Sequence, residues 1–204
     1  MIKEIPIFYA CDDAFAKYTI VSLSSMIKNA STEYNYKVYV LNTNITEDMK
    51  NRLSALQNDN FEVIFADVNA YLDSVEKELP IRHYYSATTY YRLFISEMYP
   101  EYDKAIYIDS DTIVLGDISK LYNTDIGDFY MAGCREQAMG QVDVYCTYCE
   151  KVVGVDRHAF FNAGMMLINC RQFREKQILK NFYNFFQYIF LQTFYKIHFL
   201  CLNC

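Results

Sequence analysis

Residues 105–115 read AIYIDSDTIVL, an apolar run that ends on two aspartates one residue apart before apolar residues resume. Unpaired carboxylates are unfavourable beside a core, so the position of this pair calls for a partner. If the strand ends here, both side chains reach the crevice beyond its carboxyl end, where open α/β sheets bind ligands. A divalent cation between Asp109 and Asp111 would remove their mutual repulsion, and all-oxygen ligation suits Mg²⁺ or Mn²⁺.

Two alternatives compete with the metal hypothesis. The sequence D-S-D-T also suits a tight turn, and an Asp can cap the segment that follows. Phosphatases of the haloacid-dehalogenase type use D-x-D at a strand end as nucleophile and acid/base. Their motif normally follows the first strand, with Thr or Val two residues after the second Asp, whereas here it follows a third or fourth predicted strand and Ile113 holds that position. The apolar run before the pair favours the metal site.

The chain around the pair alternates strand-like and helix-like segments. Strand patterns cover residues 5–11, 36–42, 61–67 and 104–109, with shorter ones at 129–134 and 164–169. Helical patterns cover 14–30, 47–57 (N-cap Thr46), 84–98 (cap Ser86) and 170–186. This β-α-β-α-β alternation predicts an α/β fold in which helices flank a mostly parallel sheet.

Composition indicates one globular domain. The chain has 204 residues, 52% apolar and 22% charged, and its net charge of −6 argues against a nucleic-acid partner. We expect no signal peptide and no transmembrane segment, because no apolar run approaches the roughly 20 residues that span a bilayer. These features predict a cytoplasmic protein.

Cysteine usage favours a reducing compartment. The seven cysteines are an odd number, and Cys11, Cys134 and Cys170 lie in strand-like stretches, where we expect reduced, buried thiols. Two C-x-x-C pairs, at 146/149 and 201/204, offer a zinc site as the alternative. The separation between the two pairs, however, far exceeds that of a zinc ribbon.

The end of the chain differs in composition. Residues 176–204 contain no Asp or Glu, and aromatic residues crowd positions 182–199. We expect a domain over 1–175 and an aromatic helix or tail over 176–204 that packs on the sheet or on a partner. Peripheral contact with the inner face of the membrane is the alternative. A shifted frame or a truncation is a third explanation.

Four stretches carry a family resemblance. In order they are IFYACDDAFAKYTIVSLSSM, SATTYYRLFISEMYPEYDKAIYIDSDTIVLGDISKLY, MAGCRE and FFNAGMMLINCRQFRE, within residues 5 to about 175. The combination resembles the retaining glycosyltransferases of family 8, such as glycogenin and the galactosyl- and glucosyltransferases of lipopolysaccharide biosynthesis. This implies the Rossmann-like GT-A fold of nucleotide-diphospho-sugar transferases. It also implies transfer of a hexose from a UDP-sugar to a saccharide, glycolipid or protein hydroxyl, with retention of the α configuration and Mn²⁺ or Mg²⁺ as cofactor.

The resemblance also assigns roles at the nucleoside end of the site. Ala10, Cys11 and Asp12 would line the uridine pocket, where the Asp12 carboxylate would accept a hydrogen bond from the uracil N–H. Phe15 stands near the family's stacking tyrosine, and Ala14 replaces an asparagine that contacts the ribose in some members. Without this context, Asp12 reads as a helix N-cap, a role that is compatible with binding.

Further roles follow for the metal and the diphosphate. Asp109 and Asp111 match the family's metal aspartates, and the backbone of Ser110 would contact the ribose. Arg92 matches a helix arginine that approaches the diphosphate and the donor sugar, for which a guanidinium supplies a rigid fork of donors. Outside this context, an arginine on a helix reads as a solvated surface residue.

The donor-sugar end completes the implied site. Glu136 falls where many members carry a carboxylate that contacts the donor sugar. Asn162, Ala163 and Gly164 match an N-A-G turn that borders the sugar, although the same residues also suit a simple tight turn. No catalytic nucleophile is identified.

The chain departs from the family pattern after residue 176. The family's Asp-Gln-Asp stretch, its histidine metal ligand and its G-x-x-K-P segment have no counterpart here, and His198 stands in the wrong context for the ligand. The alternative function is therefore an inactive, truncated relative that binds UDP or a protein partner.

Overall fold

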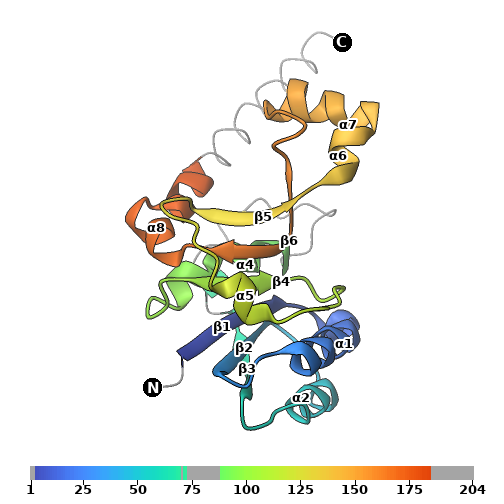
Figure 1. The fold of residues 1–204 in the computed structure, drawn as a ribbon, viewed down its shortest axis with the longest axis vertical. Helices are drawn as coiled ribbons and strands as arrows, with labels where there is room; N and C mark the ends of the chain where they lie inside the picture. The colour runs from blue at the N-terminus through green and yellow to red at the C-terminus, as the bar shows by residue number, and fades with distance from the viewer. Residues whose placement is uncertain (1–2, 70, 73–87, 185–204) are drawn as a thin grey trace, which may run out of the picture.

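The structure is a computed structural model that describes residues 3–69, 71–72 and 88–184 (Figure 1). Its strands are β1 (Lys3–Ala10), β2 (Tyr34–Asn42), β3 (Phe61–Asp67), β4 (Ala105–Ile108), β5 (Met131–Arg135) and β6 (Phe161–Ile168). Its helices are α1 (Asp13–Asn29), α2 (Glu47–Ser54), α4 (Thr88–Met98), α5 (Ile118–Tyr122), α6 (Gln137–Gln141), α7 (Asp143–Tyr148) and α8 (Cys170–Glu175). A π-helical turn, η2 (Cys149–Val153), follows α7.

The strands form one mixed sheet in the order β3-β2-β1-β4-β6-β5. β3, β2, β1 and β4 are parallel, and β6 is antiparallel to both β4 and β5. The expected mostly parallel sheet flanked by helices is therefore confirmed. The chain runs outward from β1 to β2 and β3, and later adds β4 on the other side of β1. The direction of strand addition thus reverses between β1 and β4, the place where open α/β sheets bind ligands.

Successive side chains of the strands enter two separate cores. Ile5, Ile7 and Tyr9 of β1 face a core that includes side chains of α1 and α2, whereas Phe8 faces a core that includes side chains of α4 and α8. Strands covered on both faces must be apolar almost throughout, and β1 and β4 are. β1 and β4 pair in parallel, with Ile7 opposite Ile106 and Phe8 opposite Tyr107, so their carboxyl ends lie side by side.

Side-chain caps start the first two helices. Asp12 Oδ1 accepts a hydrogen bond from the Phe15 N–H over 3.0 Å, and Thr46 Oγ1 accepts one from the Met49 N–H, so the predicted cap of α2 is confirmed. Asp13 Oδ1 accepts from both the N–H and the hydroxyl of Thr46, which lowers the pKa of Asp13 below its usual value. The starts of α1 and α2 are therefore tied together.

The single helix predicted at 170–186 is wrong within the described residues. Gln177 takes a left-handed φ of 50°, and the helix resumes over 178–184. Phe173 and Leu179 both enter the core, yet residues six apart on a continuous helix point about 120° apart. The break allows both side chains to reach the same core.

Other boundaries differ less. β5 and β6 lie at 131–135 and 161–168, displaced from the predicted 129–134 and 164–169, and α2 ends at Ser54. α4 begins at Thr88, and the predicted cap Ser86 lies outside the described residues. The short elements α5, α6, α7 and η2 were not predicted, because five or six residues contain too little periodicity to be recognised.

Cysteine burial follows the expectation at two of three positions. Cys11 and Cys170 are buried free thiols, but Cys134 is exposed. The reason is that β5 is an edge strand, and a bulge between Gly133 and Cys134 shifts its register against β6. The second C-x-x-C pair lies outside the described residues, so the zinc alternative stays untested.

The described start of the aromatic segment packs onto the protein. Leu179 and Tyr183 are 6% and 7% exposed and belong to the core beside α4. Among the described helices, none has the length and apolar character needed to cross a membrane. The domain boundary at residue 175 stays a prediction.

Shortening a buried side chain of β1 tests this architecture. Ile7 of β1 is fully buried, so Ile7→Ala should lower the free energy of unfolding by about 2–5 kcal/mol through lost burial and the cavity left behind. Val21→Ala, on the exposed face of α1, is the control and should change it by less than about 0.5 kcal/mol. Urea unfolding followed by circular dichroism measures both, and equal effects would contradict the assigned core.

Candidate functional site

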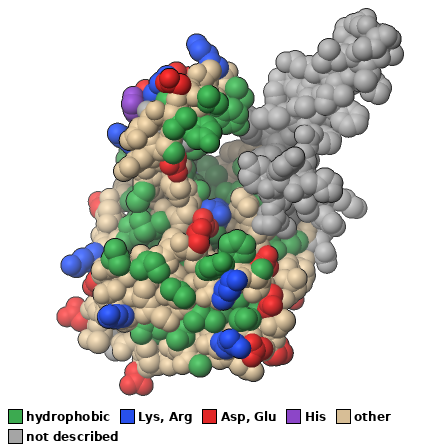
Figure 2. Space-filling model, turned by 90° about the vertical axis from the view of Figure 1, so that its right-hand side faces the viewer, with side chains coloured by type: hydrophobic (Ala, Val, Ile, Leu, Met, Phe, Trp, Pro, Cys, Tyr) green, Lys and Arg blue, Asp and Glu red, His purple; other side chains and the backbone are tan. Residues whose placement is uncertain are grey.

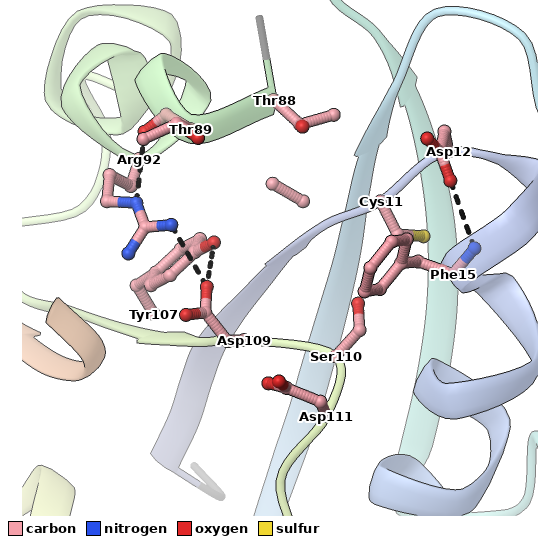
Figure 3. A pocket seen from close by; sticks show the side chains of 11 residues that line it. Cys11, Asp12, Phe15, Thr88, Thr89, Arg92, Tyr107, Asp109, Ser110 and Asp111 are labelled. Carbon is pink, nitrogen blue, oxygen red and sulfur yellow. Dashed lines mark hydrogen bonds and ion pairs between the residues drawn. The ribbon is translucent and has the colours of Figure 1, made fainter. Parts of the chain in front are cut away.

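A cleft opens beyond the carboxyl ends of β1 and β4. Its volume is about 240 Å³, near the lower limit of roughly 300 Å³ for small-molecule sites. On the face in Figure 2, a hollow near the middle of the molecule has acidic and basic side chains at its rim. The lining residues are Ala10, Cys11, Asp12, Phe15, Thr88, Thr89, Arg92, Tyr107, Asp109, Ser110 and Asp111 (Figure 3). The structure thus brings together the residues assigned from sequence to the nucleoside, the diphosphate and the metal.

One oxygen of the Asp109 carboxylate is held by two donors. Arg92 Nη2 donates to Oδ1 over 3.0 Å, and the Tyr107 hydroxyl donates to the same oxygen over 2.6 Å (Figure 3). Burial raises the pKa of Tyr107 far above its usual value, so the phenol keeps the proton that it donates. The other oxygen, Oδ2, accepts no hydrogen bond from the described residues.

The Arg92 guanidinium is fixed from several directions. Nε donates to the Thr89 carbonyl over 3.0 Å, and Nη1 donates to the Ala163 carbonyl over 2.5 Å. Its Cζ also lies 4.4 Å from the centroid of the Tyr107 ring, a cation–π contact. Only 14% of the side chain is exposed. The positive charge is therefore held in place beside Asp109, and the guanidinium connects α4 to the N-A-G segment of β6.

The N-A-G segment was predicted to form a turn, but Asn162, Ala163 and Gly164 lie in strand β6, where the register against β5 shifts. This segment supports Asp109 through the backbone. The Asp109 N–H donates to the Gly164 carbonyl over 2.7 Å, and the Gly164 N–H donates to Asn162 Oδ1 over 2.7 Å. A Cβ at Gly164 would lie only 2.9 Å from Asp109 Oδ2 and from Asn162 Oδ1. Glycine is needed here for this close approach of backbone and carboxylate.

Asp111 presents an uncommitted carboxylate. Its residue is exposed, and it makes no hydrogen bond or ion pair with the part of the chain that the structure describes. Asp111 and Asp109 line the same cleft (Figure 3). Asp109 Oδ2 and the two Asp111 oxygens are hard ligands of the kind that Mg²⁺ and Mn²⁺ prefer, so the pair fits such an ion.

The donor set at this point is incomplete for a cage made of protein alone. Within the described ranges, no cluster of three His, Cys, Asp or Glu side chains could hold a metal ion. Mg²⁺ and similar ions are commonly held by one or two carboxylates together with phosphate oxygens and waters. The two aspartates therefore suit an ion that is shared with a bound diphosphate.

The nucleoside end combines a carboxylate, a ring and a thiol. Asp12 uses Oδ1 to cap α1, which leaves its other oxygen for a ligand donor. Phe15 is 49% exposed, with its ring 5.6 Å from that of Tyr18, so it offers a face for stacking. Burial raises the pKa of the Cys11 thiol, which is therefore neutral. The binding roles of these residues stay predictions.

The donor-sugar candidates form a second cluster beside the cleft. Asn162 Nδ2 donates to Glu136 Oε2 over 2.8 Å, and the Ala138 N–H donates to Oε1 over 3.1 Å. These bonds hold the pKa of Glu136 below its usual value. Neither Glu136 nor Asn162 lines the cleft itself. The cluster is connected to the cleft through Gly164 and Asp109.

Sequence reasoning missed Tyr107, Thr88 and Thr89, all of which line the cleft. A signal for Tyr107 existed, because side chains two apart on a strand share a face, and Tyr107 precedes Asp109 by two residues. The two threonines carried no comparable signal. They line the cleft from the first described residues of α4.

Comparisons with known proteins agree on one family. The family model described as glycosyl transferase family 8 matches residues 6–198. A Haemophilus influenzae protein with the provisional name of glycosyltransferase is 31% identical over 184 residues, covering 89% of this chain and 53% of that protein. The chain spans about half the length of the curated relatives it matches.

Solved structures share the fold. The bifunctional glycosyltransferase WbbM superposes with a TM-score of 0.75 at 28% identity, covering 87% of this chain and 33% of that one. The galactosyltransferase LgtC, solved in complex with donor and acceptor sugar analogs, superposes with a TM-score of 0.67 at 26% identity, covering 84% of this chain and 60% of that one. The expected GT-A fold is confirmed by these neighbours.

The close approach of Gly164 to Asp109 generates a prediction. In Gly164→Ala, the added methyl group would displace the Asp109 carboxylate from Arg92 and Tyr107, so the free energy of unfolding should fall by about 1–3 kcal/mol. Gly116→Ala is the matched control, because a Cβ at Gly116 meets nothing within 4 Å. Urea unfolding measures both variants. A Gly164→Ala protein as stable as the control would contradict the geometry at Asp109.

Proposed function

Because this chain belongs to glycosyl transferase family 8, we propose that it transfers a hexose from a UDP-sugar to an acceptor hydroxyl, with retention of the α configuration, in a reaction that depends on a divalent metal ion. The observation that carries the proposal is the convergence of Asp12, Arg92, Asp109 and Asp111 in one cleft. These side chains come from three separate segments of the chain. The cleft lies at the reversal point between β1 and β4.

The nucleotide would lie along the carboxyl end of the sheet. Asp12 would accept the uracil N–H with the oxygen that does not cap α1, and Phe15 would stack on the ring. Arg92 has N–H groups beyond those that bind Thr89, Ala163 and Asp109. These remaining donors would contact the diphosphate, whose charge they complement.

Asp109 and Asp111 would hold Mn²⁺ or Mg²⁺ against the diphosphate. When bound, the ion supplies Lewis-acid stabilisation of the leaving group. The chain supplies a carboxylate whose Oδ1 is fixed by Arg92 and Tyr107, and a second carboxylate that faces the cleft. Such fixed charges need no reorganisation as the reaction proceeds.

The proposed step exchanges a glycosyl-phosphate bond for a glycosidic bond. The bond between the sugar C1 and the β-phosphate oxygen breaks, a bond from C1 to the acceptor oxygen forms, and the acceptor proton passes to the departing phosphate. Glu136 and Asn162 would contact the donor-sugar hydroxyls, next to Ala163 and Gly164 of β6. A saccharide, glycolipid or protein is the proposed acceptor. The donor and acceptor analogs named for LgtC support a two-substrate site in this fold.

The family assignment sets aside the phosphatase alternative. A chain that binds UDP without turnover remains the second candidate function, because the described residues supply two carboxylates to the metal and no third ligand. The division into a nucleotide-sugar domain over 1–175 and an aromatic segment over 176–204 is part of the proposal.

Hydrolysis of UDP-glucose and UDP-galactose, with Mn²⁺ or with EDTA, tests the proposal. The protein should release UDP only with Mn²⁺, and Asp111→Asn should lower the rate on the order of 100-fold, because it removes a fixed charge at the diphosphate. Asp59→Asn is the control, since Asp59 is exposed in the loop before β3, away from the cleft.

Calorimetry with UDP and Mn²⁺ accompanies the assay. Binding without any release of UDP would favour the inactive relative. If the protein neither binds UDP with Mn²⁺ nor releases UDP from the donors, the proposal is overturned.

A further inference from the structure

The buried face of α1 carries hydroxyl side chains where a packed helix normally carries apolar ones. Thr19 and Ser22 are both fully buried, and they lie three residues apart, hence on one face. Buried hydroxyls are unfavourable unless they are hydrogen-bonded. Both bind the segment that follows β4, which contains the two aspartates.

The first contact anchors the residue before Asp111. Thr19 Oγ1 donates to Ser110 Oγ over 2.8 Å, and Ser110 is only 4% exposed. Ser110 separates the two aspartates, and all three residues line the cleft (Figure 3). This bond fixes the loop from the helix side.

The second contact anchors the residue after Asp111. Thr112 Oγ1 lies 2.9 Å from Ser22 Oγ, and Ser22 Oγ lies 2.9 Å from the Tyr9 hydroxyl. Thr112 also donates to the Asp109 carbonyl over 2.9 Å. Four groups are therefore connected in one row, which we call the hydroxyl row: Tyr9, Ser22, Thr112 and the Asp109 carbonyl.

Chemistry fixes the direction of every bond in the hydroxyl row. A carbonyl only accepts, so the single proton of Thr112 goes to Asp109. Thr112 must then accept from Ser22, and Ser22 must accept from Tyr9. Burial raises the pKa of Tyr9 well above its usual value, so the phenol keeps its proton. Each hydroxyl proton of the row therefore has a single acceptor, and the hydrogen bonds of the row can form in only one direction.

We propose that Thr19, Ser22 and Thr112 are positioning residues, which hold the loop so that the Asp111 carboxylate is placed for the metal before any ligand binds. The inference rests on the proposed function. Asp111 has no hydrogen bond of its own among the described residues, yet the residues on both sides of it are anchored to α1. The Asp111 carboxylate thus accepts no hydrogen bond from the described residues, while the backbone on both sides of it is held by α1.

Further contacts extend the same anchoring. Ser25 Oγ accepts from the Val114 N–H over 2.8 Å, and Asn29 Nδ2 donates to the Val114 carbonyl over 2.9 Å. Together with the bond from the Asp109 N–H to Gly164, they fix the loop at both ends. α1 is therefore a structural template for the aspartate loop as well as a wall of the nucleoside pocket.

Thr112→Val tests the proposal, because valine matches the shape of threonine and lacks the hydroxyl. At saturating UDP, the apparent Kd for Mn²⁺, measured by electron paramagnetic resonance, should rise about fivefold, the effect of one lost neutral hydrogen bond. UDP affinity in EDTA should change less than about twofold. Thr112→Ser keeps the hydroxyl and should restore the wild-type Kd.

A second measurement does not depend on the metal. In the metal-free protein, the amides of Asp109 and Val114, which are hydrogen-bonded at the two ends of the loop, should exchange with deuterium about fivefold faster in Thr112→Val and in Ser22→Ala than in the wild type. Ser24→Ala is the matched control, because Ser24 lies on the exposed side of α1 and bonds only to Ile20. It should leave both the exchange rates and the Kd unchanged.

The outcomes separate the inference from the proposed function. If the wild type binds Mn²⁺ with UDP and Thr112→Val binds it equally well, the inference is overturned. It is also overturned if Thr112→Ser is as weak as Thr112→Val, or if UDP affinity in EDTA falls in parallel. If the wild type binds no Mn²⁺ with UDP, the proposed function fails, and the exchange rates alone decide whether the row holds the loop.

Discussion

The negative charge of Asp109, at the end of a buried strand, is the constraint on which the cleft depends. Its carboxylate lies beside the apolar interior, where an unmatched charge is unfavourable. Arg92 of α4 supplies the opposite charge, and Tyr107 of β4 supplies a second donor to the same oxygen. The backbone N–H of Asp109 is bound by β6. Asp109 is therefore bonded to residues of α4, β4 and β6.

The two aspartates differ in how their charges are handled. Asp109 is partly neutralised and fixed, whereas Asp111 is exposed and uncommitted within the described residues. A pair with one fixed and one free carboxylate avoids the full repulsion of two free charges while it keeps a net negative potential for a cation. The same cleft contains a positive guanidinium, which suits a ligand with its own negative charge. The metal-bound diphosphate of the proposed function would match both charges.

The sheet and the first residues of the site could be predicted from sequence, because they depend on local patterns. Long apolar runs identify β1, β2 and β4, and the motif around Asp109 marks the end of a strand. Tyr107 was missed because its role depends on the position of Arg92, which comes from a distant helix. The break at Gln177 depends on two side chains reaching one core, and the exposure of Cys134 depends on a bulge. The break at Gln177 and the bulge beside Cys134 arise from tertiary packing and leave no signature in a short window of residues.

The bond between the Asp109 N–H and the Gly164 carbonyl has a consequence for engineering this fold. Asp109 and Gly164 of β6 lie 55 positions apart along the chain, yet the Asp109 carboxylate occupies the space that a side chain at position 164 would fill. Any hybrid assembled from two homologous sequences must take both segments from the same parent. In a hybrid with a crossover point between them, the loop of Asp109 and the strand of Gly164 would come from different parents, and the close contact between them would not be preserved as a unit.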